Sequence, residues 1–294
     1  MIKNIKVKGD NNQISLEGDI NNFYIPNYYK IKQELTIKTK NIFSSKVLKL
    51  IEEITKYESD FGIEDISDIL NFDSVSELTD QINSEREPSK AFLNYFSEQL
   101  KISNNWLRYS RNYMFNYPSL RTLFVSDLYD LLIKEEFEEL YFITSESPER
   151  EALILIKYRE YIYRNCFRRI PFHKNVGASG ASMIYDFYKF LIKWSKNRDL
   201  VNKTCEYTVS KDIFESILIG DIYKGCIKRK SRISYICEDF ICLNCSTYEE
   251  EYYKKIYDED FFICRDIVRQ KLNKQKDSKP LWVLSYYSRL QITE

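Results

Sequence analysis

The sequence predicts an α+β fold in three parts: a β-hairpin arm at 1–26, an all-α domain at 44–115 and a mixed domain at 120–294. Three observations support this division. Apolar and polar residues alternate in the first part, apolar residues recur every three or four positions in the second, and both patterns occur in the third. Residues 27–43 are polar and basic and are expected to form a linker.

The composition is typical of a globular chain with a sizeable core. The 294 residues are 44% hydrophobic and 30% charged, and contain only 7 Gly and 6 Pro, which excludes intrinsic disorder and low-complexity classes. The 44 basic side chains balance the 44 acidic ones, which excludes a polybasic nucleic-acid coat. No apolar run approaches the roughly 18 residues of a membrane span. No export signal is recognisable, so we expect no membrane partner, a cytoplasmic location and reduced cysteines.

The arm has the pattern of two short strands around a turn. Residues 5–8 and 13–17 alternate apolar and polar side chains, and Gly9-Asp10-Asn11-Asn12 forms a turn cluster between them. Two strands alone are marginally stable in water. The arm is therefore expected to pair with the body of its own chain or with another copy. We expect a homo-oligomer, formed through this arm or through the C-terminal domain.

The second part is expected to contain a series of short helices. Leu48, Ile51 and Ile54 fall at helical spacing, and four segments follow at 63–70, 74–82, 88–100 and 103–109. The start of each of the last three is marked by a residue that favours a helix N-terminus. These are Ser74 with Glu77 as a capping box, Pro88 in a first turn, and Ser103 as a cap.

Residues 46–110 resemble the phage-repressor (XRE-type) helix-turn-helix family. The residues that carry the resemblance are Ile66, Ile69, Leu70, Ser74, Leu78, Pro88, Ser89, Phe92, Leu93, Phe96, Leu100, Ile102, Trp106 and Leu107. The resemblance implies that the helix starting at Ser74 enters the major groove of double-stranded DNA. It implies base contacts by Ser74, Ser76, Glu77 and Gln81. If DNA is bound in this way, we expect the basic residues Lys101, Arg108 and Arg111 to hold phosphates.

The charge of this segment argues against DNA. Between residues 63 and 90 there are eight acidic and two basic side chains, a net charge of 2 − 8 = −6. Phosphate contacts supply most non-specific DNA affinity, and they need cations. Basic residues at 38–56 and 98–121 could compensate if they flank the groove-facing helix. Otherwise the domain would be a protein-binding module.

The third part is expected to mix helices with one antiparallel hairpin. Helices are predicted at 120–134, 182–196, 210–219 and 248–273. Strands are predicted at 140–143 and 152–163. The loop before the helix at 182 contains Gly177, Ser179, Gly180 and Ser182, which could hold a phosphate at the helix N-terminus. The alternative is a plain strand-to-helix loop. No dinucleotide or P-loop motif is present. We expect no cofactor and no enzymatic activity, with the C-terminal domain left open on the second point.

The cysteines allow one metal interpretation. Cys237, Cys242, Cys245 and Cys264 have a spacing that could form a four-thiolate zinc site. Only one C-x2-C pair occurs, whereas zinc ribbons have two, and free cysteine is commonly a small buried residue. We therefore expect no metal.

Taken together, these patterns predict a bacterial DNA-binding transcriptional regulator of the kind carried by mobile elements, with a C-terminal sensing or oligomerisation domain. Two alternatives stay open. One is a protein-interaction module in an assembly, for example one related to a mobile element or to phage defence. The other is an effector enzyme that uses the loop at 177–182.

Overall fold

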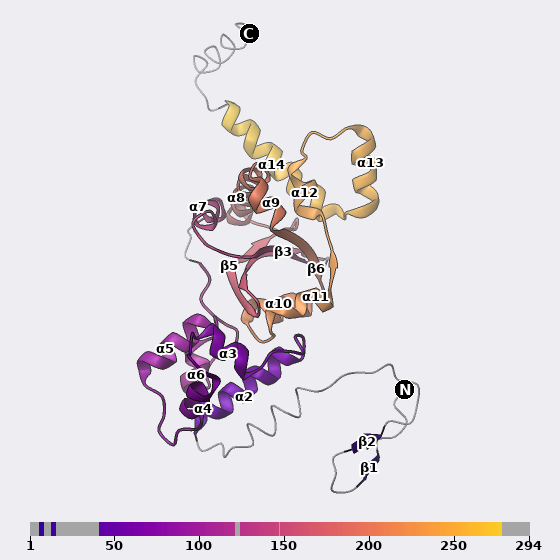
Figure 1. Ribbon diagram of the computed structural model, residues 1–294. Coiled ribbons are helices and arrows are strands. Elements are labelled where there is room, and N and C mark those ends of the chain that lie inside the picture. Colours follow the sequence, from indigo (N-terminus) through magenta and orange to yellow (C-terminus); the bar gives the residue numbers. More distant parts are fainter. Residues whose placement is uncertain (1–5, 9–12, 16–40, 121–123, 147, 278–294) are drawn as a thin grey trace.

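The fold is α+β, as predicted (Figure 1). The computed structural model describes residues 6–8, 13–15, 41–120, 124–146 and 148–277. Strand β1 (Lys6–Lys8) pairs antiparallel with β2 (Gln13–Ser15), with Val7 opposite Ile14. The hairpin predicted from the alternating pattern is therefore present. Its turn at 9–12 and most of the predicted linker lie outside the described residues.

A compact group of helices follows. They are α2 (Ile42–Thr55), α3 (Ile63–Ile69), α4 (Val75–Asn83), α5 (Lys90–Gln99) and α6 (Asn104–Tyr109). Helix α2 begins at Ile42, inside the predicted linker. Asn41 explains the early start, because its side-chain oxygen accepts a hydrogen bond from the Ser44 amide over 2.7 Å.

Ser74 and Ser103 cap α4 and α6 as predicted, but at Ser74 only one of the two hydrogen bonds of the predicted capping box is formed. The Ser74 hydroxyl accepts from the Glu77 amide over 3.2 Å, and the Ser103 hydroxyl accepts from the Trp106 amide over 3.3 Å. Pro88 was expected in the first turn of α5, and this placement was wrong. Ser89 is the cap instead, because its hydroxyl can accept from the Phe92 amide over 3.1 Å, and proline has no such group.

The C-terminal half is built on a five-stranded mixed sheet in the order β5-β4-β3-β6-β7. Its strands are β3 (Glu139–Ser145), β4 (Glu151–Arg159), β5 (Ile162–Pro171), β6 (Thr204–Val209) and β7 (Ser231–Ile233). β3 pairs antiparallel with β4 and parallel with β6. The antiparallel hairpin predicted from strands at 140–143 and 152–163 is confirmed by β3 and β4, but its second strand ends at Arg159. The chain turns at Tyr161, whose φ is +63°, and Tyr163 belongs to β5.

Helices cover both faces of this sheet. They are α7 (Leu128–Leu132), α8 (Ala178–Ser195), α9 (Arg198–Asn202), α10 (Lys211–Ile219), α11 (Ile227–Lys230), α12 (Ile236–Ile241), α13 (Thr247–Ile256) and α14 (Glu259–Asp277). Short 3₁₀ turns precede α7 (Val125–Asp127) and α11 (Lys224–Cys226). The predicted helix at 248–273 is split, because the Asp258 carboxylate accepts from the Phe261 amide and starts a new helix. In the part of the chain that the structure describes, no helix has both the length and the apolar character of a membrane span.

Alternation along β3 separates two cores. Leu140 and Phe142 point to the side covered by α8, α12 and α14. Tyr141 and Ile143 point to the opposite side, where their hydrophobic cluster continues into helices α2–α6. The helical part and the sheet therefore share a continuous apolar core, with α10 and α11 between them (Figure 1).

Specific contacts fix this junction. The ring of Phe61, just before α3, lies 4.8 Å from that of Tyr161 at the β4–β5 turn. The Arg159 guanidinium donates to the Ile69 carbonyl over 2.9 Å. The Phe115 amide donates to the Gly220 carbonyl over 3.0 Å. The C-terminal half thus contacts the end of α3, the helix that directly precedes α4 in the chain.

Candidate functional site

Helix α4 is amphipathic, with one face in the helical core and one in solvent. Leu78 and Ile82 are fully buried. The outward residues are the predicted base contacts Ser74, Ser76, Glu77 and Gln81, together with Asp80. The carboxyl end of α4 is fixed by α2, because the Ser44 hydroxyl donates to the Ile82 carbonyl over 2.6 Å. The polar face is therefore presented on a helix whose position is set by the core.

The location of α4 leaves this face open. In Figure 1 the helix lies on the side of the helical group that faces away from the sheet. The contacts of α4 are made chiefly with α2 and α3. Nothing in the described C-terminal half covers the exposed positions, all of which stay accessible.

The predicted phosphate contacts lie in two different environments. Arg108 is half-buried and Arg111 is exposed. Their guanidinium carbons lie 4.9 and 6.0 Å from the centre of the Tyr109 ring. Lys101 instead lies at the junction, with its ammonium 5.2 Å from the Tyr117 ring centre. Burial lowers the pKa of Lys101, with nearby Arg164 acting in the same direction. The structure therefore groups Arg108 with Arg111 and separates Lys101 from them.

The basic segment at 38–56 contributes less exposed charge than its sequence indicates. Lys46 is buried, donates to the Trp106 carbonyl over 3.0 Å and lies 4.4 Å from the Trp106 ring centre. Lys56 pairs with Glu53 over 2.6 Å. Lys49 is exposed, whereas Lys38 and Lys40 lie outside the described residues.

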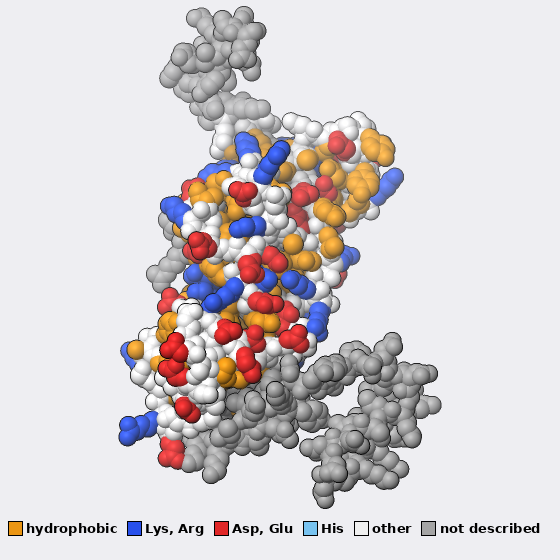
Figure 2. Space-filling model, in the orientation of Figure 1, with side chains coloured by type: hydrophobic (Ala, Val, Ile, Leu, Met, Phe, Trp, Pro, Cys, Tyr) orange, Lys and Arg blue, Asp and Glu red, His pale blue; other side chains and the backbone are white. Residues whose placement is uncertain are grey.

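Acidic side chains dominate the surface around α3 and α4. All of the acids between residues 63 and 90 are exposed except the half-buried Asp65. The Asp65 carboxylate accepts from the Gly62 amide over 2.6 Å and so caps α3. Figure 2 shows red carboxylate atoms gathered over this part of the molecule, on the face in view. The charge imbalance seen in the sequence is therefore a property of the folded surface.

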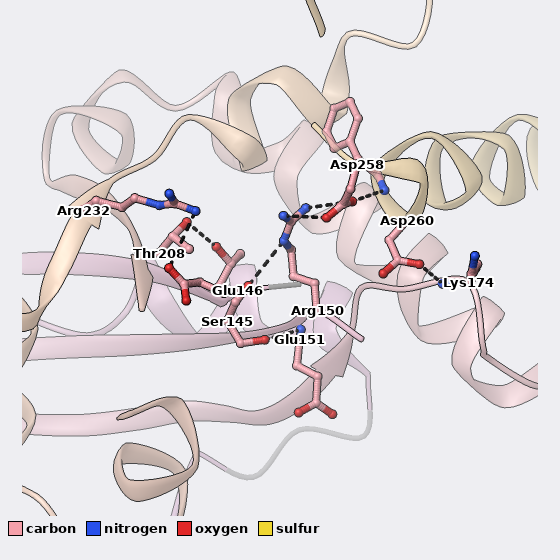
Figure 3. Close-up of polar contacts among 11 residues, drawn as sticks. Ser145, Glu146, Arg150, Glu151, Lys174, Thr208, Arg232, Asp258 and Asp260 are labelled. Atoms are coloured by element: carbon pink, nitrogen blue, oxygen red, sulfur yellow. Dashed lines mark hydrogen bonds and ion pairs between the residues drawn. The ribbon is translucent and has the colours of Figure 1, made fainter. Parts of the chain in front are cut away.

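A second polar group lies where the parallel strands β3 and β6 end (Figure 3). Arg150 is 8% exposed, and its guanidinium pairs with the Asp258 carboxylate over 3.0 Å and donates to the Ser145 carbonyl over 3.3 Å. The Lys174 amide donates to Asp260 over 2.9 Å. Ligands of open α/β sheets bind at this end of the strands. Here, however, the charged groups are paired with one another, and they fasten the start of α14 to the sheet.

Glu151 extends this group toward the edge strand. It is 8% exposed and pairs with Arg169 over 3.2 Å, while Arg169 also pairs with Glu215 over 2.6 Å. Burial raises the pKa of Glu151, and the Arg169 charge opposes that shift. Sequence analysis did not identify Arg150, Glu151 or Asp258, because their proximity depends on pairing between distant segments.

The glycine-containing loop at 177–182 forms the start of α8. Gly177 is its N-cap, and Ser179 and Ser182 lie within the first turns. The Ser182 hydroxyl donates to the Ala178 carbonyl over 3.0 Å. A Cβ on Gly180 would lie 2.8 Å from the Val176 Cβ, so glycine is required for close packing. This packing accounts for Gly180 without a ligand.

The four candidate zinc ligands are not gathered. Cys237 and Cys264 are buried, Cys242 is exposed and Cys245 is partly exposed. Over the described ranges, no group of three or more His, Cys, Asp or Glu side chains has an arrangement that could hold a metal ion. Burial raises the pKa of the Cys237 and Cys264 thiols, which disfavours the thiolate form that zinc binds. These two cysteines occupy the core as small apolar side chains.

Comparisons with protein-family models, curated proteins and solved structures find no match for this chain. The features of this chain that bear on function are the exposed polar face of α4 and the acidic surface around it.

Proposed function

We propose that the protein is a transcriptional regulator that binds double-stranded DNA through helix α4. The exposed first half of α4 supports this proposal. Ser74 caps its N-terminus, and its outward side chains are polar and exposed. A recognition helix needs both features, because its N-terminal residues contact base edges in the major groove. Gln81 would pair with adenine and Glu77 would accept from cytosine. Arg108 and Arg111 would contact phosphates, and Lys101 would do so only by leaving its aromatic contacts.

A second candidate function is favoured by charge. The net charge of −6 between residues 63 and 90 repels phosphates. The Lys46 ammonium does not offset this charge at the surface, because it is buried and donates to the Trp106 carbonyl. The same exposed face of α4 would then recognise a basic protein surface, and the chain would be an adaptor in an assembly. Charge complementarity supplies specificity and association rate in such interfaces.

For the C-terminal half, we propose a sensing or oligomerisation role, with the arm at 1–26 as a further contact between copies in the cytoplasm. An effector-enzyme role for the loop at 177–182 has less support. Gly180 there has a packing explanation, and the charged groups at the end of β3 and β6 are paired with one another.

The DNA proposal is tested with purified full-length chain and fragmented genomic DNA from bacteria. Retained fragments are sequenced after binding at low and at physiological salt. The expected result is an enriched common sequence whose affinity falls with the logarithm of salt concentration. The double variant Glu77→Ala with Gln81→Ala should lose that enrichment, at a cost of about 1–3 kcal/mol for each base contact removed.

The matched control is Glu251→Ala with Gln270→Ala, which removes the same atom types from exposed positions on α13 and α14. It should retain wild-type enrichment. Absence of retention even at low salt would exclude the DNA proposal. Capture of a basic protein, lost in the Glu77 and Gln81 double variant alone, would establish the adaptor function.

A further inference from the structure

A pair of cysteines lies in the loop between α12 and α13, beside an open hollow of about 570 Å³. Cys242 is exposed and Cys245 is partly exposed. The polar residues that line the hollow with them are Asn244, Glu249, Arg269 and Asn273. Solvent-borne molecules of small size therefore have access to both thiols.

Behind this loop lies a buried guanidinium. Arg265 of α14 is 0% exposed. Its Nη2 atom donates to the Cys242 carbonyl and to the Cys245 sulfur, the latter over 2.6 Å. The rings of Tyr253 and Phe261 lie 5.4 and 5.5 Å from its guanidinium carbon. The Arg265 charge is thus directed at the cysteine loop.

The charge of Arg265 has no carboxylate partner among the described residues. Its Nε and Nη1 atoms are buried without a hydrogen-bond acceptor. The buried Arg150, by contrast, is paired with Asp258 over 3.0 Å. A buried charge without a counter-charge costs several kcal/mol. The nearest group of the loop that can carry negative charge is the Cys245 sulfur.

We propose that Cys242 and Cys245 form a redox-active dithiol that reacts with low-molecular-weight disulfides, with Cys245 as the nucleophile and Arg265 as the group that stabilises negative charge on its sulfur. Thiolates are the attacking species in thiol–disulfide exchange, and a neighbouring cation favours them. A C-x2-C spacing places a second thiol where it can resolve the first product. Cys242 has that resolving role.

The reaction has two balanced steps. The Cys245 thiolate attacks one sulfur of the small disulfide, a bond forms between the two sulfurs, and one small thiolate leaves and takes up a proton. Cys242 then loses its proton to solvent and attacks the Cys245 sulfur, which releases the second small thiolate. The protein dithiol is oxidised by two electrons to a disulfide, and the small disulfide is reduced to two thiols.

The properties of Cys242 fit the second step. Burial raises the pKa of its thiol, and the nearby Asp239 carboxylate acts in the same direction. The Arg265 guanidinium contacts the backbone carbonyl of Cys242 but the sulfur of Cys245, so Cys242 is assigned the second step. Cys205 on β6 is also half-buried, and burial raises its pKa, but it has no guanidinium contact. Cys205 thus serves as an internal control.

The test uses full-length protein, reduced, desalted and then mixed with oxidised glutathione at pH 7. Free thiols are blocked with N-ethylmaleimide at timed intervals, and peptides are mapped by mass spectrometry. A disulfide between Cys242 and Cys245 should appear first, while Cys205 stays reduced. In Cys242→Ser, a glutathione adduct should accumulate on Cys245. In Cys245→Ser, Cys242 should react more slowly by about tenfold.

The role of Arg265 is tested with Arg265→Met, which should slow adduct formation on Cys245 by about tenfold. The control is Arg198→Met, which removes an exposed guanidinium from α9, a helix that does not line the hollow. Circular dichroism checks the folding of both variants. If Arg265→Met does not fold, the test is the rate at which oxidised glutathione reacts with Cys245 compared with Cys205 in the wild-type protein. Equal rates, absence of the Cys242–Cys245 disulfide, or an unchanged rate in folded Arg265→Met would overturn the proposal.

Discussion

The ammonium of Lys224 donates to the Phe115 carbonyl over 2.9 Å inside the junction between the helical part and the sheet. Lys224 is 2% exposed, and burial lowers its pKa to about 7, with Arg164 adding to the effect. The unfolded chain keeps this proton up to the ordinary lysine pKa of 10.5. Unfolding therefore takes up a proton between pH 7 and 10.5, and this residue makes the free energy of unfolding rise with pH across that window.

We predict that Lys224→Met removes this pH dependence. The wild-type free energy of unfolding should include a rise from Lys224 of up to about 1.4 kcal/mol per pH unit above pH 7. The free energy of unfolding of the variant should exceed that of the wild type by most at pH 7, and this difference should shrink toward pH 9. Urea denaturation at a series of pH values measures it. Lys49→Met, at an exposed position on α2, is the control. A gain that is constant with pH would contradict the prediction.

Glu206 on β6 should give a pH dependence of opposite sign. Its carboxyl group is 8% exposed and accepts from the Cys237 and Glu238 amides over 2.9 and 3.2 Å. Burial raises its pKa to about 8, against the opposing effect of these hydrogen bonds. The folded protein holds a proton that the unfolded chain releases near pH 4.5. The stability supplied by this group is therefore lost as pH rises from 4.5 through 8.

Glu206→Gln should keep an acceptor for both amides without a titratable group. Relative to wild type, its free energy of unfolding should improve between pH 4.5 and 8, by up to about 1.4 kcal/mol per pH unit. Urea denaturation in that range measures the difference, with the exposed Glu251→Gln as control. A difference that does not change with pH would show that Glu206 is ionised in the folded protein.

Gly220 should be irreplaceable by alanine. It ends α10 with φ of +81°, and a Cβ there would lie 2.3 Å from the Asn116 backbone nitrogen. The left-handed conformation and the clash should together cost about 2–4 kcal/mol. The control is Gly177→Ala, since Gly177 has no atom within 4 Å of its added Cβ. Thermal denaturation of the two variants gives the comparison, and an equal loss of stability would contradict the prediction.

The sequence predicted the helices of the N-terminal half well because their boundaries are set locally. Ser74 and Ser103 cap α4 and α6 through amides three residues away, so these starts are readable from a few adjacent positions. Helix α8 was predicted at 182–196 but begins at Ala178, because the small residues of its first turn carry no apolar period that would mark the start. The start of α5 was predicted less accurately, because Pro88 and Ser89 are neighbours and each can mark the start of a helix.

The strands of the C-terminal half were harder to predict because their partners are remote. β6 carries the polar residues Glu206 and Thr208 on a buried face, so it has no clear alternation. Its place depends on parallel pairing with β3, for example Ile143 opposite Tyr207. Likewise, Arg265 and Cys245 are 20 residues apart in sequence, and only the packing of α14 behind the loop brings them together.

The identity of the partner of α4 is tested by the sign of one charge change. Asp80 lies on the exposed face of the helix. If DNA binds there, Asp80→Asn should raise DNA affinity several-fold at low salt, because one repulsion of phosphates is removed, and the gain should fade at higher ionic strength. If a basic protein binds there, the same change should weaken that complex. Asp212→Asn, exposed on α10, is the control and should leave both affinities unchanged. Fluorescence anisotropy with a labelled duplex measures the first effect at several salt concentrations. An unchanged affinity for every partner would show that α4 is not the contact surface.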